Sequence, residues 1–124
     1  MDCRPNRMLL VEDDGQTRIL LRRMLTLCGW EVTEAASLTE GFDRLDPPPD
    51  CLLLDLELPD GDGASLLRKV RTEDIPTRVI VNTGMEDATR LGTVAGMQPD
   101  ALLKKPLDSA GLNTICARDS GLPV

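Results

Sequence analysis

Histidine and tyrosine are both absent from this chain of 124 residues. The lack of histidine removes serine–histidine and cysteine–histidine catalysis, and with them the commonest zinc ligand. Aromatic side chains are scarce as well, since Trp30 and Phe42 are the only two. Any chemistry that this protein performs must therefore rest on carboxylates, hydroxyls and lysine.

Long apolar runs are also missing. No stretch approaches the ~20 apolar residues of a membrane span, and the N-terminal segment MDCRPNRM lacks the apolar core of a signal peptide. We therefore expect a cytoplasmic protein with no membrane contact. The cysteines are few, widely spaced and without a CxxC pair, which favours buried free thiols over a metal or redox site: Cys3, Cys28, Cys51 and Cys116.

Positive charge is in deficit, because 14 basic residues face 21 acidic ones and leave a net charge of −7. Such a balance opposes binding to a phosphate backbone, so we expect no direct nucleic-acid partner. With 41% hydrophobic and 28% charged residues, the composition is that of a soluble globular domain. The length is enough for one domain, residues 1–124, and too short for two.

Apolar runs of strand length alternate with segments of helical period. The runs that we interpret as strands cover residues 8–11, 30–35, 51–54, 78–82 and 101–104. The segments that we interpret as helices cover residues 16–27, 37–45, a stretch around 66–70, 87–95 and 108–118. Strict alternation of this kind predicts an α/β fold with a parallel sheet and helices on both of its faces.

Several local signals refine this pattern. Asp14 is placed to cap the first helix, and residues 37–40 form a capping box for the second. The first helix should bury one apolar face, made of Leu20, Leu21, Met24, Leu25 and Cys28. The segment 56–63 has the composition of a turn. Its DGDG sequence lacks the ligand spacing of a calcium loop, so we interpret it as a solvated turn.

Polar residues close the strands at what should be one rim of the sheet, where such folds bind ligands: Glu12, Asp13, Asp55, Thr83 and Lys105. Two carboxylates ~4 Å apart repel each other by about 4 kcal/mol at an effective dielectric constant near 20. Lys105, a divalent cation or protonation of one acid could compensate for this repulsion. Among metals, hard oxygen ligands favour magnesium over zinc.

Taken together, these features of the chain resemble a known family, the receiver domain of bacterial two-component response regulators. The resemblance covers residues 7–117 and rests on LLVEDDGQTRILL, LLLDLELPDGDG, VIVNTG and VAGMQPDALLKKP, four motifs in the right order and spacing. It implies a flavodoxin-like, doubly wound sheet of five strands in the order 2-1-3-4-5 with five helices. It also implies a cis peptide bond at Lys105-Pro106.

The resemblance further implies a role for each site residue. Asp55 resembles the phosphoacceptor, which takes a phosphoryl group from a phosphohistidine of a sensor histidine kinase or a histidine phosphotransfer protein. Asp13 resembles a direct magnesium ligand, Glu12 a ligand through water, and Glu57 a ligand through its main-chain carbonyl. Thr83 and Lys105 resemble the groups that hold the phosphoryl oxygens and switch the conformation for a downstream protein target. Such a domain is a signalling phosphoacceptor that assists its own phosphorylation and dephosphorylation, and is not an enzyme in the usual sense.

One position departs from the family pattern, because Leu102 stands where an aromatic residue is frequent. Two other functions stay open at this stage. A flavodoxin-like small-molecule binder or phosphohydrolase would use the same rim, although no glycine-rich phosphate loop follows the first strand. A phosphorylation-independent interaction module is the other, although all five site positions carry competent residues. We expect no output domain within this sequence, which leaves open a stand-alone receiver or a fragment of a longer regulator or hybrid kinase.

Overall fold

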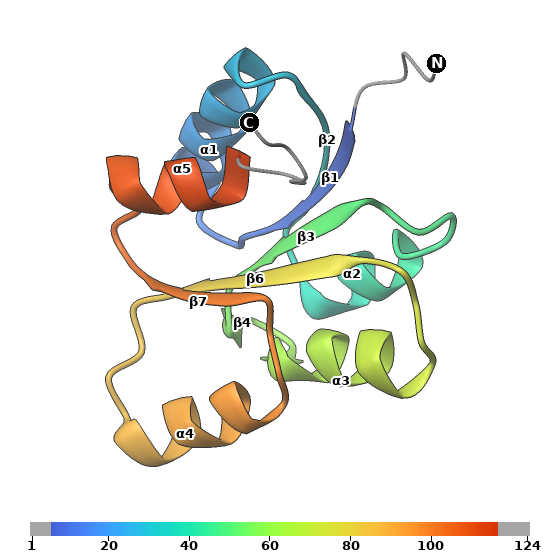
Figure 1. The fold of residues 1–124 in the computed structure, drawn as a ribbon, viewed down its shortest axis with the longest axis vertical. Coiled ribbons are helices and arrows are strands. Elements are labelled where there is room, and N and C mark those ends of the chain that lie inside the picture. The colour runs from blue at the N-terminus through green and yellow to red at the C-terminus, as the bar shows by residue number, and fades with distance from the viewer. Residues whose placement is uncertain (1–5, 117–124) are drawn as a thin grey trace, which may run out of the picture.

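The computed structural model describes residues 6–116 and shows a five-stranded parallel sheet between two layers of helices (Figure 1). Its strands are β1 (Asn6–Val11), β2 (Trp30–Ala35), β3 (Cys51–Leu54), β6 (Arg78–Thr83) and β7 (Ala101–Lys104). The helices are α1 (Gly15–Leu27), α2 (Leu38–Asp43), α3 (Ala64–Thr72), α4 (Ala88–Gly96) and α5 (Ser109–Cys116). The spatial order β2-β1-β3-β6-β7 confirms the predicted 2-1-3-4-5 topology. The expected continuation of the last helix beyond residue 116 lies outside the described residues.

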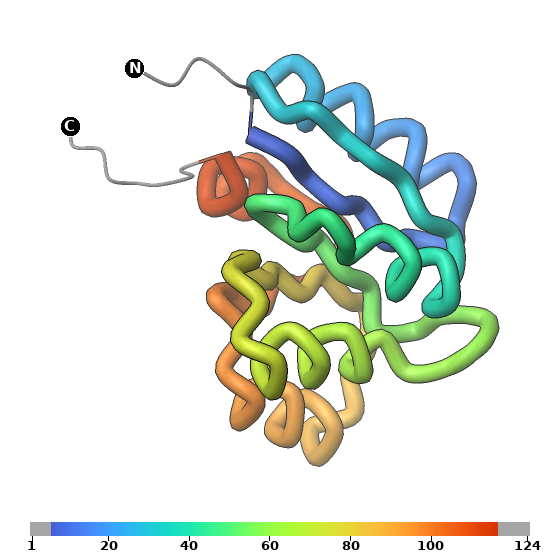
Figure 2. Tube along the Cα trace, turned by 90° about the vertical axis from the view of Figure 1, so that its right-hand side faces the viewer, coloured from blue at the N-terminus to red at the C-terminus, as the bar shows by residue number. Residues whose placement is uncertain are grey.

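The sheet separates two hydrophobic cores, because successive residues of a strand point to opposite faces. Helices α1 and α5 cover one face, and α2, α3 and α4 cover the other (Figures 1 and 2). Strand β3 lies between β1 and β6, and all four of its residues are buried. This explains its uninterrupted apolar sequence, CLLL. Within residues 6–116, no helix has the length and apolar character needed to cross a membrane.

The helix starts follow the predicted capping signals. Asp14 accepts a hydrogen bond from the Thr17 backbone at 2.9 Å, and Ser37 accepts one from the Glu40 backbone at 3.1 Å. Each bond satisfies a donor that the first turn of a helix leaves unpaired. The side-chain and backbone bonds to Thr17 also lower the pKa of the Asp14 carboxyl.

The predicted apolar face of α1 is wrong in part. Leu21 and Leu25 are buried, but Leu20 is 58% exposed. Neighbouring residues of a helix point about 100° apart, so Leu20 and Leu21 cannot both face the sheet.

The cysteines differ from expectation as well, because Cys51 is buried while Cys28 and Cys116 are only partly so. Cys3 lies outside the described residues. Burial raises the pKa of the Cys51 thiol to about 12, so this thiol stays protonated and unreactive.

The segment 56–63 is not simply a solvated turn, because it contains a hairpin of two short antiparallel strands, β4 (Glu57–Leu58) and β5 (Gly61–Asp62). At its tip, Asp60 accepts hydrogen bonds from the backbones of Leu38 and Thr39 at 2.7 and 3.0 Å, which lower the pKa of its carboxyl. At its base, a Cβ on Gly63 would lie 2.1 Å from the Asp55 carbonyl oxygen. The hairpin is therefore fixed at both ends, directly after Asp55.

Candidate functional site

Buried polar residues gather at one rim of the sheet. Among the described residues, five polar or charged side chains are buried: Glu12, Asp55, Thr77, Asn82 and Thr83. Thr77 precedes β6 and donates its hydroxyl to the Pro49 carbonyl at 2.7 Å, which explains its burial. The other four lie at the carboxyl ends of β1, β3 and β6. Burial of polar groups is costly, so this concentration marks the rim as the candidate site.

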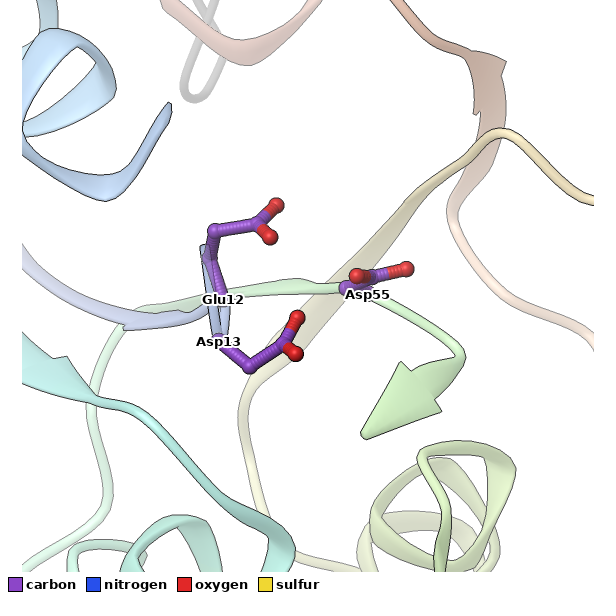
Figure 3. Close-up of side chains that lie close together, drawn as sticks. All are labelled: Glu12, Asp13 and Asp55. Atoms are coloured by element: carbon purple, nitrogen blue, oxygen red, sulfur yellow. The ribbon is translucent and has the colours of Figure 1, made fainter. Parts of the chain in front are cut away.

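Three carboxylates meet at this rim. Glu12, Asp13 and Asp55 each offer an oxygen, and these oxygens all lie within 4.8 Å of one another (Figure 3). Glu12 and Asp55 are buried, while Asp13 is exposed. The sequence therefore placed these three acids correctly in one cluster.

Lys105 compensates for part of their mutual repulsion. Its Nζ lies 2.7 Å from Glu12 Oε1 and 3.1 Å from Asp55 Oδ2. The sequence leaves open three ways to offset this repulsion: Lys105, a divalent cation or protonation of one acid. The described residues show the first of these, the Lys105 ammonium. One ammonium does not balance three carboxylates, so the cluster remains an acidic site that favours a cation.

Burial and hydrogen bonding shift the pKa values of Glu12 and Lys105. Desolvation raises the pKa of the Glu12 carboxyl, and hydrogen bonds from Lys105 and the Asp14 backbone offset this only in part. For Lys105, desolvation acts against the charged form, but the bonds and charges of Glu12 and Asp55 outweigh it and raise the pKa of the ammonium. Lys105 is therefore held as a cation against the two buried acids.

Arg18, which the sequence analysis did not single out, holds the backbone of the acidic loop, residues 12–14, in place. Its Nη1 donates to the Glu12 carbonyl oxygen at 2.9 Å, and its Nε pairs with Glu34 Oε1 at 3.1 Å. The Asp14 backbone N–H in turn donates to Glu12 Oε2 at 3.1 Å. Glu12 is thus held at both its backbone and its side chain. A basic residue one turn into the helix is too common a feature to have shown this from sequence.

The remaining predicted site residues lie around the cluster. Thr83 is the last residue of β6 instead of the residue after it, and its buried hydroxyl accepts a hydrogen bond from the Met85 backbone at 3.1 Å. The Lys105 backbone donates to the Thr83 carbonyl at 2.9 Å, and the Lys105–Pro106 peptide bond is cis, as the resemblance implies. The Glu57 backbone donates to Asp55 Oδ1 at 3.2 Å, so the residue predicted to offer its carbonyl lies beside Asp55.

Comparison with known proteins agrees with this geometry. The model of the response regulator receiver domain family matches residues 8–117. The transcriptional regulatory protein TrcR of Mycobacterium tuberculosis is 34% identical over 122 residues, which are 98% of this chain and 46% of that protein. The transcriptional regulatory protein CpxR of Escherichia coli is 33% identical over 108 residues, 86% of this chain and 46% of that protein.

Solved structures show the same likeness. A CheY-like response regulator receiver domain protein from Methanospirillum hungatei superposes with a TM-score of 0.82 at 26% identity, covering 90% of each chain. This chain spans about half the length of the curated relatives that it matches.

Proposed function

Because this chain belongs to the response regulator receiver domain family, and is thus a signalling phosphoacceptor of a two-component system, we propose that Asp55 receives the phosphoryl group. The observation that carries this assignment is the position of its carboxylate. Asp55 directly follows the central strand β3. One of its oxygens lies within 4.8 Å of a carboxylate oxygen of Glu12 and of Asp13, and its Oδ2 lies 3.1 Å from the Lys105 ammonium. One oxygen of Asp55 can then act as the nucleophile, while its other oxygen and the carboxylates of Glu12 and Asp13 are available for a cation.

The chemistry is an in-line phosphoryl transfer. A carboxylate oxygen of Asp55 forms a bond to phosphorus as the bond from phosphorus to the imidazole nitrogen of a donor phosphohistidine breaks, and the imidazole takes up a proton. Transfer of this kind needs mainly positioning and charge neutralisation. We assign Lys105 and the Thr83 hydroxyl to the phosphoryl oxygens, because the Lys105 ammonium lies 3.1 Å from Asp55 and Thr83 ends β6, the strand next to β3, at the same rim.

The cluster fits a magnesium ion. Its donors are hard oxygens, and its acidic charge exceeds what Lys105 neutralises. We propose that Asp13 and Asp55 bind the ion directly, Glu12 through water, and Glu57 through its main-chain carbonyl. A bound magnesium ion would supply positive charge against the phosphoryl oxygens during transfer.

We further propose a sensor histidine kinase or histidine phosphotransfer protein as donor, a downstream protein as target, and the cytoplasm as location. The family membership supports this proposal. Residues 1–124 would then form a single receiver domain with its core over residues 7–117, which agrees with the extent of the family match. Phosphorylation would switch the conformation that the target recognises, and the same groups would assist dephosphorylation.

The test of this function is magnesium-dependent phosphorylation. Incubation of the chain with acetyl phosphate should add the mass of one phosphoryl group, and chelation of magnesium should prevent it. Intact-mass spectrometry measures both. A flavodoxin-like binder or a phosphorylation-independent module would gain no mass under either condition.

Trp30 should report on folding and not on the metal site. In the register of β1 and β2, Trp30 pairs with Asn6 at the amino ends of both strands, whereas Ala35 pairs with Val11, which precedes Glu12. Five residues at ~3.3 Å each place the indole roughly 17 Å along the strand from the rim. We expect tryptophan fluorescence to change little on magnesium titration and strongly on unfolding in guanidinium, which serves as the control. Strong quenching by magnesium would contradict the assigned site.

Leu102 should contribute little to stability. Truncation of a buried leucine to alanine costs about 2–5 kcal/mol, but the Leu102 side chain is 37% exposed. We therefore expect Leu102→Ala to cost on the order of 1 kcal/mol of stability and to retain phosphorylation. Leu54→Ala, at a position that is 0% exposed, is the matched control and should cost about 2–5 kcal/mol. Urea denaturation measures both, and equal losses would show that Leu102 is part of the core.

A further inference from the structure

Asn82 is a polar residue in an apolar position. It follows Ile80 by two residues in β6, so both side chains point to the sheet face that α1 and α5 cover. Asn82 is only 3% exposed, and within residues 6–116 its Oδ1 has no hydrogen-bond partner. A buried acceptor without a donor destabilises a fold, so such an atom needs an explanation.

Lys105 is a charged donor that lines the same cavity as Asn82. Asn82 and Lys105 line the same cavity of about 400 Å³, whose other walls include Leu21 and Met24 of α1. Thr17 also lines the cavity, but its hydroxyl already donates to Asp14 Oδ2. The Lys105 backbone donates to the carbonyl of Thr83, the residue next to Asn82. Asn82 and Lys105 thus border the same cavity, and their backbones are linked through Thr83.

The Lys105 ammonium and a divalent cation require the same oxygens. Lys105 Nζ contacts Glu12 Oε1 and Asp55 Oδ2, and both carboxylates belong to the three-acid cluster. A cation held by that cluster repels the ammonium and competes for its acceptors. The Lys105 side chain is only 26% exposed, so a displaced ammonium that stays within the site gains from a new acceptor there.

We propose that Asn82 is a positioning residue for Lys105, and that its carboxamide oxygen accepts a hydrogen bond from the Lys105 ammonium when a divalent cation occupies the cluster of Glu12, Asp13 and Asp55. This inference rests on the proposed magnesium site. It gives the unpaired oxygen a partner in the cation-bound state, and it makes cation binding depend on a residue that does not touch the cation.

The experiment measures magnesium affinity by titration calorimetry in four proteins: the wild type, Asn82→Leu, Lys105→Met and the double variant. Leucine has the same number of side-chain heavy atoms as asparagine and the same branching at Cγ, but no acceptor. We expect Asn82→Leu to weaken magnesium binding about tenfold, the effect of losing one hydrogen bond to a charged group. In the Lys105→Met background the same change should have no effect, because the ammonium is absent.

The outcomes separate this inference from the magnesium site itself. If Asn82→Leu binds magnesium within twofold of the wild type, or weakens it equally without Lys105, the inference is overturned. If Asp13→Ala binds magnesium as well as the wild type, the metal site is misassigned. A second measurement needs no substitution: the side-chain ¹³Cγ resonance of Asn82 should move downfield on saturation with magnesium. A resonance that stays in place also overturns the inference.

Discussion

Replacing Asp55 by asparagine is expected to abolish phosphorylation. The wild type should gain one phosphoryl mass from acetyl phosphate and magnesium, and Asp55→Asn should gain none. A carboxamide oxygen is a poor nucleophile and carries no negative charge, so the substitution removes the attacking group while it keeps the size of the side chain. The expected loss is complete, because no other carboxylate of the cluster follows the central strand.

The matched control is Asp43→Asn, which makes the same chemical change at an exposed residue at the end of α2. This variant should be labelled like the wild type. Far-UV circular dichroism checks that Asp55→Asn remains folded, since the substitution also removes an acceptor of Lys105. Equal labelling of Asp55→Asn and the wild type would transfer the phosphoacceptor role to another residue.

The second large effect concerns which residue of the acidic loop binds the metal, Asp13 or Asp14. We expect Asp13→Ala to weaken magnesium binding by at least about tenfold, the loss typical of disturbing a metal's ligand shell. Asp14→Ala should leave magnesium affinity nearly unchanged. The reason is that the Asp13 carboxylate belongs to the cluster, whereas the Asp14 carboxylate accepts from the backbone and the hydroxyl of Thr17.

Titration calorimetry ranks the two variants, and thermal unfolding provides the control. Asp14→Ala should lower the unfolding temperature, because it removes the cap of α1. If Asp14→Ala weakened magnesium binding more than Asp13→Ala, the second acid of the pair would be misassigned.

Much of this site could be predicted from the sequence, because a parallel sheet places the carboxyl ends of all its strands at one edge. A run such as CLLL before Asp55 identifies a central strand, and parallel strands bring their carboxyl ends to one edge wherever their helices lie. Glu12, Asp13, Asp55 and Thr83 could therefore be assigned to one rim without coordinates. The helix caps at Asp14 and Ser37 were equally readable, since a cap depends on residues only three apart.

The tertiary structure decided what depends on rotation and on the path of loops. The exposure of Leu20 follows from how α1 is turned on the sheet, and the bonds of Asp60 follow from the hairpin reaching α2. Composition alone does not encode either. Lys105 was one of three compensating devices until its distances to Glu12 and Asp55 were known. Asn82 appeared only as part of a strand, because the lack of a partner for its oxygen depends on every side chain packed around it.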